Sequence, residues 1–199
     1  MLPAVTMHRR KLWTRAEIER MERAGLLEEE HVELIEGELI NKMGEGNPHV
    51  ISVKFFHGWL ASVFGFDFVL QGAPIDVAPE DNPTSEPQPD VCVLTRPYWS
   101  DMDEPRTAND VRLAVEVSAT SLYIDLKNKA GLYARAGIPE YWALDVESRR
   151  LYVHRYPENG KYKSVIVYGE SESIAPLAAP DHALRIGDAF PGRRALPLA

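Results

Sequence analysis

Hydrophobic positions along the chain follow the periods of helices and strands. Ile51, Phe55 and Trp59 recur every four residues, which is the spacing of one buried helix face, and Asn47 is the expected N-cap of that helix. Residues 113–117 are apolar except for one acid, which predicts a strand buried on both faces. The same two periods predict further helices at residues 14–25 and 125–136, strands at 66–70, 74–77, 90–94, 141–145 and 184–186, and hairpins at 32–40 and 151–168.

The order of these elements indicates the fold class. A strand, a helix and a strand follow one another from Leu113 to Asp145, which predicts a right-handed crossover between two parallel strands. The two hairpins predict antiparallel pairs. We therefore expect an α/β (α+β) fold, in which helices flank a mixed β-sheet. For 199 residues we expect one domain, with a core at about residues 12–190 and peripheral ends at 1–11 and 191–199.

The composition excludes several classes of protein. No run of eighteen apolar residues is present, so no membrane-spanning helix is expected, and the first ten residues lack the apolar segment of a secretory signal. Cys92 is the one cysteine, which excludes an internal disulfide and a cysteine-based zinc site and fits a reducing, cytoplasmic location. The formal net charge of −8 argues against a broad, non-specific nucleic-acid surface. It does not exclude a nuclease, because a cation bound in an acidic site reverses the local charge.

Two acids stand where burial is expected. Asp90 begins the strand-like run 90–94, and Glu116 interrupts the apolar run 113–117. An ionised carboxylate is costly to bury unless a cation or several hydrogen bonds compensate it. Carboxylates at the ends of adjacent buried strands therefore predict a divalent-metal site. Each acid also has a structural alternative, because Glu116 can pair with Arg112 on the same strand face and Asp90 can end a loop.

A lysine on the following predicted helix is placed to reach these acids. The apolar stripe of that helix consists of Leu126, Ala130, Tyr133 and Gly137. At about 100° per residue, Lys129 lies roughly 60° from the centre of the stripe and Lys127 roughly 100° away on the other flank. We therefore expect Lys129 to lean toward the carboxylates, where an ammonium can orient a water and help to deprotonate it. The alternative is a solvated lysine paired with Asp125, four residues earlier.

Several motifs together resemble one protein family. They are Pro89-Asp90, Glu116-Val117-Ser118, the spacing of Asp125, Lys129 and Tyr133, the run Gly137-Ile138-Pro139-Glu140-Tyr141-Trp142, the run Glu33-Leu34-Ile35-Glu36-Gly37-Glu38, and Pro48-His49. This combination resembles the Uma-type family of restriction endonucleases, within the PD-(D/E)xK nuclease superfamily. The resemblance extends over about residues 12–190, and the run from Glu116 to Trp142 is its most specific part.

The resemblance implies a restriction endonuclease-like core with a metal-dependent site that hydrolyses DNA phosphodiester bonds. The catalytic residues it implies are Asp90, Glu116 and Lys129. It also implies Mg²⁺, for which Mn²⁺ can substitute, held by Asp90, Glu116 and the backbone carbonyl of Val117. The sequence departs from the usual superfamily pattern at Ser118, where a lysine is common, and in the Uma-type family that lysine corresponds to Lys129 on the next helix.

Other side chains are assigned from their context. Glu33, His49 and Tyr133 are accessory candidates for the site. Each of them also has a structural alternative. Glu33 can have a surface or ion-paired role, His49 can be a partly exposed histidine at a helix start, and Tyr133 can simply pack. Among the remaining aromatic, histidine and cysteine side chains, we expect a core position for Tyr141, Trp142 and Cys92 and a surface position for His154 and His182.

The expected partner is DNA, by resemblance, and a homodimer is expected because cutting a duplex needs two sites or two encounters. Two other functions stay open. A catalytically silent module on a nuclease fold would bind DNA or protein without cutting, and its stability would not respond to divalent ions. A structural protein without a ligand would use the apolar residues of the hairpin at 151–168 as an interface.

Overall fold

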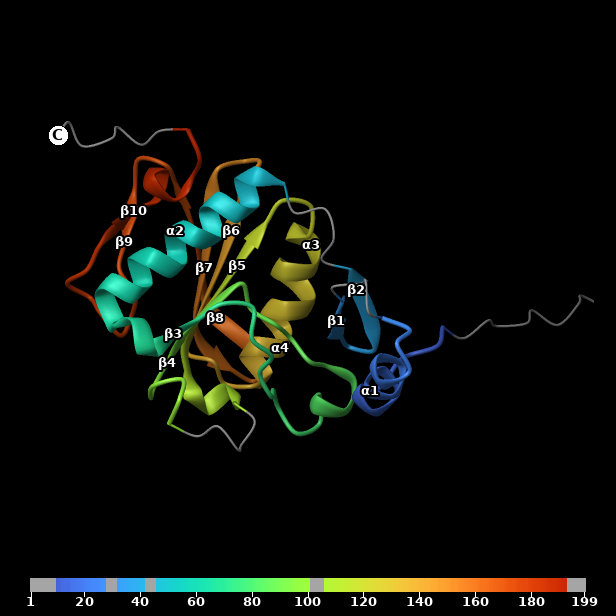
Figure 1. Ribbon diagram of the computed structural model, residues 1–199. Helices are drawn as coiled ribbons and strands as arrows, with labels where there is room; N and C mark the ends of the chain where they lie inside the picture. The colour runs from blue at the N-terminus through green and yellow to red at the C-terminus, as the bar shows by residue number, and fades with distance from the viewer. Residues whose placement is uncertain (1–9, 28–31, 42–45, 101–105, 193–199) are drawn as a thin grey trace, which may run out of the picture.

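A six-stranded mixed sheet forms the centre of the protein (Figure 1). The computed structural model describes residues 10–27, 32–41, 46–100 and 106–192. The strands, in their spatial order, are β3 (Val69–Leu70), β4 (Val91–Leu94), β5 (Val111–Ser118), β6 (Glu140–Asp145), β7 (Arg150–Glu158) and β8 (Lys161–Gly169). Only β5 and β6 pair in parallel, as the strand–helix–strand order predicts, and the other neighbours are antiparallel. The mixed sheet of the predicted fold class is confirmed.

Helices cover both faces of this sheet. On one face α2 (Asn47–Phe64) packs its apolar side against Val115 and other strand residues. On the other face lie α3 (Leu122–Ile124), the π-helical turn η4 (Asp125–Lys129) and α4 (Ala130–Arg135). Successive residues of β5 point to opposite faces, so Val115 joins the first core and Ala114 the second.

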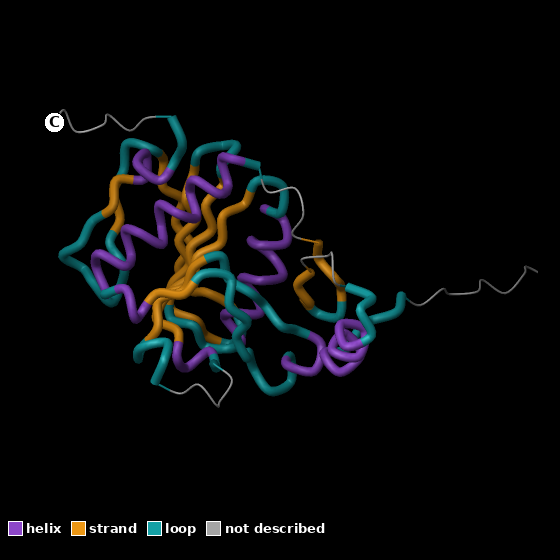
Figure 2. The backbone as a smooth tube through the Cα atoms, in the orientation of Figure 1, coloured by secondary structure: helices purple, strands orange, loops and turns teal. Residues whose placement is uncertain are grey.

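A small hairpin packs on the outside of α4. It consists of β1 (Val32–Ile35) and β2 (Glu38–Asn41), and Ile35 contacts Leu132 in a separate apolar cluster. The loop segment between β3 and β4, which is teal in Figure 2, bonds to this hairpin, because the N–H of Glu86 donates to the carbonyl of Leu34 at 2.7 Å. The remaining elements are α1 (Arg15–Arg23), β9 (Ser173–Ile174), β10 (Leu184–Arg185) and the short 3-10 helices η1 (Phe66–Phe68), η2 (Asn82–Thr84), η3 (Ala108–Asp110) and η5 (Ile186–Ala189).

Several predicted boundaries are wrong. Gly46, not Asn47, caps α2, so Pro48 occupies the second helical position rather than the first. The segment 66–70 is mostly a 3-10 helix, and 74–77 contributes one isolated bridge at Asp76 rather than a strand. The helix predicted at 125–136 begins earlier, at Leu122, and contains the π-helical turn. The predicted ends at 1–11 and 191–199 lie largely outside the described residues.

Burial of single residues mostly follows expectation. Cys92, Tyr141 and Trp142 are buried, and His182 is exposed. His154 is only 5% exposed, which contradicts the predicted surface position. The reason is that β7 lies between β6 and β8, and His154 packs between the rings of Tyr141 on β6 and Tyr162 on β8. In the described part of the chain, no helix is both long and apolar enough to cross a membrane.

Candidate active site

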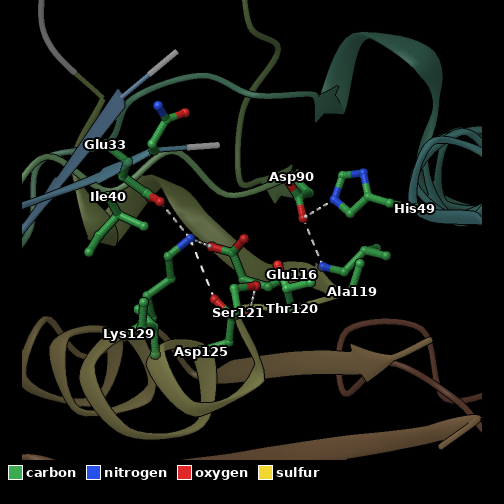
Figure 3. Close-up of a pocket in the computed structure, with 13 residues that line it drawn as sticks. Glu33, Ile40, His49, Asp90, Glu116, Ala119, Thr120, Ser121, Asp125 and Lys129 are labelled. Carbon is green, nitrogen blue, oxygen red and sulfur yellow. Dashed lines mark hydrogen bonds and ion pairs between the residues drawn. The ribbon is translucent and has the colours of Figure 1, made fainter. Parts of the chain in front are cut away.

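The register of two neighbouring strands brings Asp90 and Glu116 together. Val91 on β4 pairs with Val115 on β5, so the next position along sets Asp90 opposite Glu116. Residues paired across an antiparallel ladder project to the same face of the sheet. Both side chains are buried, at 9% and 2% exposure, and both line one pocket (Figure 3). The sheet itself therefore supplies the convergence that the sequence predicts for these acids.

Asp90 is held by two donors from different elements. Its Oδ2 accepts a hydrogen bond from the N–H of Val117 at 2.8 Å and lies 3.3 Å from Nε2 of His49. His49 belongs to the first turn of α2 and is 5% exposed, which contradicts the partly exposed alternative. These contacts fix the orientation of the Asp90 carboxylate toward the end of β5.

Glu116 is held from the helix side of the sheet. Its Oε1 accepts a hydrogen bond from the hydroxyl of Tyr133 at 2.8 Å and forms an ion pair with Nζ of Lys129 at 2.9 Å. Burial, together with the negative charges of Glu116 and Glu33, raises the pKa of Tyr133 well above its ordinary value. Tyr133 therefore stays a protonated donor. The alternative ion pair with Arg112 is wrong, because that guanidinium donates to the carbonyl of Thr95.

Lys129 is the centre of the charge cluster in Figure 3. Its Nζ lies 2.7 Å from Oε2 of Glu33, 2.9 Å from Oε1 of Glu116 and 3.7 Å from Oδ1 of Asp125. Lys129 is 3% exposed whereas Lys127 is exposed, so the predicted facing of the two lysines is confirmed and the solvated alternative is wrong.

The protonation state of Lys129 follows from these neighbours. Burial alone would lower the pKa of Lys129, but the negative charges of Glu116, Glu33, Asp125 and Asp90 outweigh burial and hold that pKa well above its ordinary value. Lys129 is therefore an ammonium at neutral pH and carries the positive charge of the cluster.

Glu33 enters the pocket from the small hairpin. It is 1% exposed, and its Oε1 accepts a hydrogen bond from the N–H of Gln88 at 2.5 Å. Its ion pair with Lys129 fits the ion-paired role that the sequence leaves open, and its burial contradicts the surface role. The packing of Ile35 against Leu132 explains why the hairpin lies close enough to α4 for this contact.

Four polar residues that line the pocket are not predicted from the sequence as site residues, namely Asn41, Thr120, Ser121 and Asp125. Asp125 is buried, and its Oδ2 accepts hydrogen bonds from the hydroxyls of Ser118 and Ser121, both at 2.6 Å. The available signal was the four-residue spacing between Asp125 and Lys129, which is equally typical of an exposed ion pair.

The chemistry of the pocket suits a divalent cation. The cavity measures about 60 Å³, which is room for a few waters or for a cation with part of its water shell. Glu33, Asp90, Glu116 and Asp125 line it with Lys129, so four carboxylates face one ammonium. Such an excess of buried negative charge is costly without a cation. Within the described ranges, no three acid, histidine or cysteine side chains already stand in metal-binding geometry.

The family comparison agrees with this chemistry. The profile of Uma2, described as "Putative restriction endonuclease", matches residues 15–187. The chain belongs to the Uma2 family. The match covers nearly all of the described core and confirms the resemblance seen in the sequence.

A solved structure shares the fold of this Uma2 chain. It is the crystal structure described as "a putative nuclease belonging to DUF820 from Anabaena variabilis ATCC 29413". The TM-score is 0.63 at 18% sequence identity, and the match covers 81% of this chain and 90% of that chain. At this identity the likeness concerns the fold. No curated protein matches the sequence.

Proposed function

We propose that this protein is a divalent-cation-dependent endonuclease that hydrolyses phosphodiester bonds in DNA. The observation that carries the proposal is the buried pocket in which Asp90 and Glu116, from adjacent strands, face a single ammonium, Lys129. The choice of DNA rests on the Uma2 family, whose description as restriction endonucleases refers to enzymes that cut DNA. The acidic pocket alone does not discriminate DNA from RNA.

Asp90 and Glu116 are the proposed holders of the cation. Carboxylate oxygens are the ligands that Mg²⁺ prefers, and Mn²⁺ accepts the same set. The N–H of Val117 points to Asp90, and a strand residue directs its N–H and carbonyl to the same neighbour, which supports the Val117 carbonyl as a further ligand. When bound, such a cation would polarise the scissile phosphate and lower the pKa of an attacking water.

Lys129 is proposed to stabilise charge on the substrate. Because its pKa is raised, it enters the reaction as an ammonium and can donate a hydrogen bond to a phosphate oxygen or to the attacking water. Its contacts with Glu33 and Glu116 fix where that donor lies. This assignment makes Lys129 an electrostatic and orienting group rather than a proton acceptor.

His49 and Tyr133 are proposed to orient the two acids. His49 contacts the Asp90 carboxylate, and Tyr133 donates to the Glu116 carboxylate from the protein interior. Tyr133 is fully buried, so contact with DNA is not its proposed role. Replacing Tyr133 with Phe would remove the hydroxyl and keep the ring, which isolates this contribution.

Cleavage of plasmid DNA tests the proposed function. The wild-type protein with Mg²⁺ or Mn²⁺ should convert supercoiled plasmid to nicked or linear DNA, and EDTA should prevent this. Lys129→Met should abolish cleavage, whereas Lys127→Met, which changes an exposed lysine of the same helical segment, should not. Equal activity of the wild type and Lys129→Met would contradict the assignment. Binding of DNA without any cleavage would favour the catalytically silent module.

Homodimerisation is a further part of the proposal. β8 is an outer strand of the sheet, and Val165, Ile166 and Val167 on it are 51%, 49% and 42% exposed. Proteins usually protect such apolar edges. The β8 strands of two copies could pair antiparallel with Ile166 of one copy opposite Ile166 of the other. Val165 of one copy then lies opposite Val167 of the other, so apolar side chains cover one another. Sedimentation should then give a dimer that Ile166→Lys dissociates, and a wild-type monomer would refute it.

A further inference from the structure

We propose that Asp125 is a positioning residue for Lys129, and that the hydroxyl of Ser118 holds Asp125 in place. This inference rests on the proposed function only in assigning Lys129 a part in cleavage. The geometry that supports it is a continuous path of contacts from β5 through Ser118 and Asp125 to the ammonium of Lys129.

The two oxygens of Asp125 have different partners. Oδ2 accepts hydrogen bonds from Ser118 and Ser121, both at 2.6 Å, and Oδ1 lies 3.7 Å from Nζ of Lys129. Serine hydroxyls are neutral donors, so they orient the carboxylate without cancelling its charge. The carboxylate of a 2% exposed side chain is thereby directed at the ammonium.

The backbone around Asp125 is fixed as well. Residues Asp125–Lys129 form a π-helical turn, and the N–H of Ala130 donates to the carbonyl of Asp125. The hydroxyl of Tyr141, a core residue of β6, donates to that same carbonyl at 3.1 Å. Single π-helical turns inside helices occur frequently at functional sites. Here the turn ends at Lys129, and both of its end residues are buried in the pocket.

The position of Ser118 on β5 explains why its hydroxyl reaches Asp125. Residues two apart on a strand point to the same face, so Ser118 lies beside Glu116 on the pocket side of β5. In the nuclease superfamily that the sequence resembles, a lysine is common at this position. In this chain Ser118 occupies that position. Its hydroxyl donates to Asp125, and Asp125 in turn faces Lys129 on the helix.

Asp125 is therefore assigned to the lysine and not to the cation. Its Oδ2 is already bonded to two hydroxyls, and its Oδ1 faces Lys129. Asp145, at the end of the neighbouring strand β6, provides a matched control. Asp145 is also buried, but its carboxylate accepts from the backbone N–H groups of Glu147 and Ser148 in a turn.

Nitrogen-detected NMR of the lysine ammonium groups tests the proposal without requiring cleavage. Ammonium protons that are shielded from water exchange slowly, so Lys129 should give a protected ¹H–¹⁵N signal that Lys129→Met removes. Asp125→Asn and Ser118→Ala should broaden or shift this signal, whereas Asp145→Asn should leave it unchanged. Melting curves establish that each variant is folded, and Ser118→Ala decides the test if Asp125→Asn does not fold.

Two results would overturn the proposal. One is a Lys129 signal that is the same in Asp125→Asn and Ser118→Ala as in the wild type, and the other is a wild-type protein without a protected lysine signal. In the cleavage assay, Asp125→Asn should lower kcat about tenfold, the size of one charge-assisted contact, and leave KM for DNA unchanged. If the wild type does not cut DNA, the proposed function fails while the NMR result still decides the role of Asp125.

Discussion

Two buried glutamates on neighbouring strands have opposite surroundings. Glu140 on β6 is 1% exposed, and its carboxylate accepts from the side chains of Trp142 and Arg155 and from the N–H of Leu177. One acid faces one guanidinium there. Glu116 on β5 is 2% exposed, but it shares one ammonium with several further carboxylates.

The difference separates a structural ion pair from a candidate active site. Around Glu140 the charges balance and the carboxylate oxygens are bonded within the protein, so nothing from solution is needed. Around Glu116 the four carboxylates exceed the single positive charge of Lys129. Burial of a carboxylate is thus weak evidence for function, and an excess of acids around one cavity is stronger evidence.

Catalysis should depend on only one of these two glutamates. Glu116→Gln should slow DNA cleavage by about 1000-fold, which corresponds to roughly 4 kcal/mol of lost transition-state stabilisation at a metal site. Glu140→Gln should keep the wild-type rate per folded molecule, because Glu140 does not line the pocket. Rates from plasmid cleavage, normalised to the folded fraction, make the comparison, and similar losses in both variants would remove the distinction.

Without divalent ions, Glu140→Gln should lower the stability of the protein more than a substitution of an acid in the pocket does. Glu140→Gln leaves Arg155 without its carboxylate and should cost about 3 kcal/mol, or roughly 6–12 °C in Tm for a chain of this size. Asp90→Asn removes one of the like charges and keeps an oxygen that can accept from Val117, so in EDTA its Tm should be unchanged or slightly higher. Calorimetric melting in EDTA measures both, and a large loss in Asp90→Asn would mean that the pocket is structural.

A smaller effect on Tm is expected from His154, a buried titratable group that lies outside the surroundings of both Glu116 and Glu140. Burial lowers the pKa of His154 below its ordinary value of 6.5, so the unfolded chain takes up this proton first as the pH falls. The stability contribution is present above the unfolded-state pKa and is lost as the pH falls toward the lower folded-state pKa. His154→Gln should therefore flatten the fall in Tm between pH 7.5 and 5.5, whereas His182→Gln, at an exposed site, should not. Parallel pH profiles in the wild type and His154→Gln would contradict this.

The sequence predicts the parts of the site that are encoded locally. An acid inside an apolar run, as at Glu116, and a lysine on the flank of an apolar stripe, as at Lys129, are visible without coordinates. Register explains why these predictions agree with the structure, because pairing of β4 with β5 leaves little freedom for where Asp90 lies. The strand–helix–strand order likewise suffices for the parallel pair.

The rest of the site depends on contacts between distant segments. Glu33 enters the pocket only because the hairpin packs on α4 through Ile35, and nothing in its neighbourhood in the sequence indicates that contact. Asp125 has the spacing of an ordinary surface partner, and its burial depends on a π-helical turn that single-residue patterns do not predict. The burial of His154 also depends on distant segments, because the sequence of one strand does not reveal whether that strand lies inside a sheet or at its edge.

Calorimetric titration with Mn²⁺ tests most directly whether the surplus of carboxylates holds a cation. The wild type should bind Mn²⁺ saturably, Asp90→Asn should lose that binding, and Glu140→Gln should keep it because its carboxylate is committed to Arg155. Absence of binding in the folded wild type, or equal binding in Asp90→Asn, would contradict a metal site between Asp90 and Glu116.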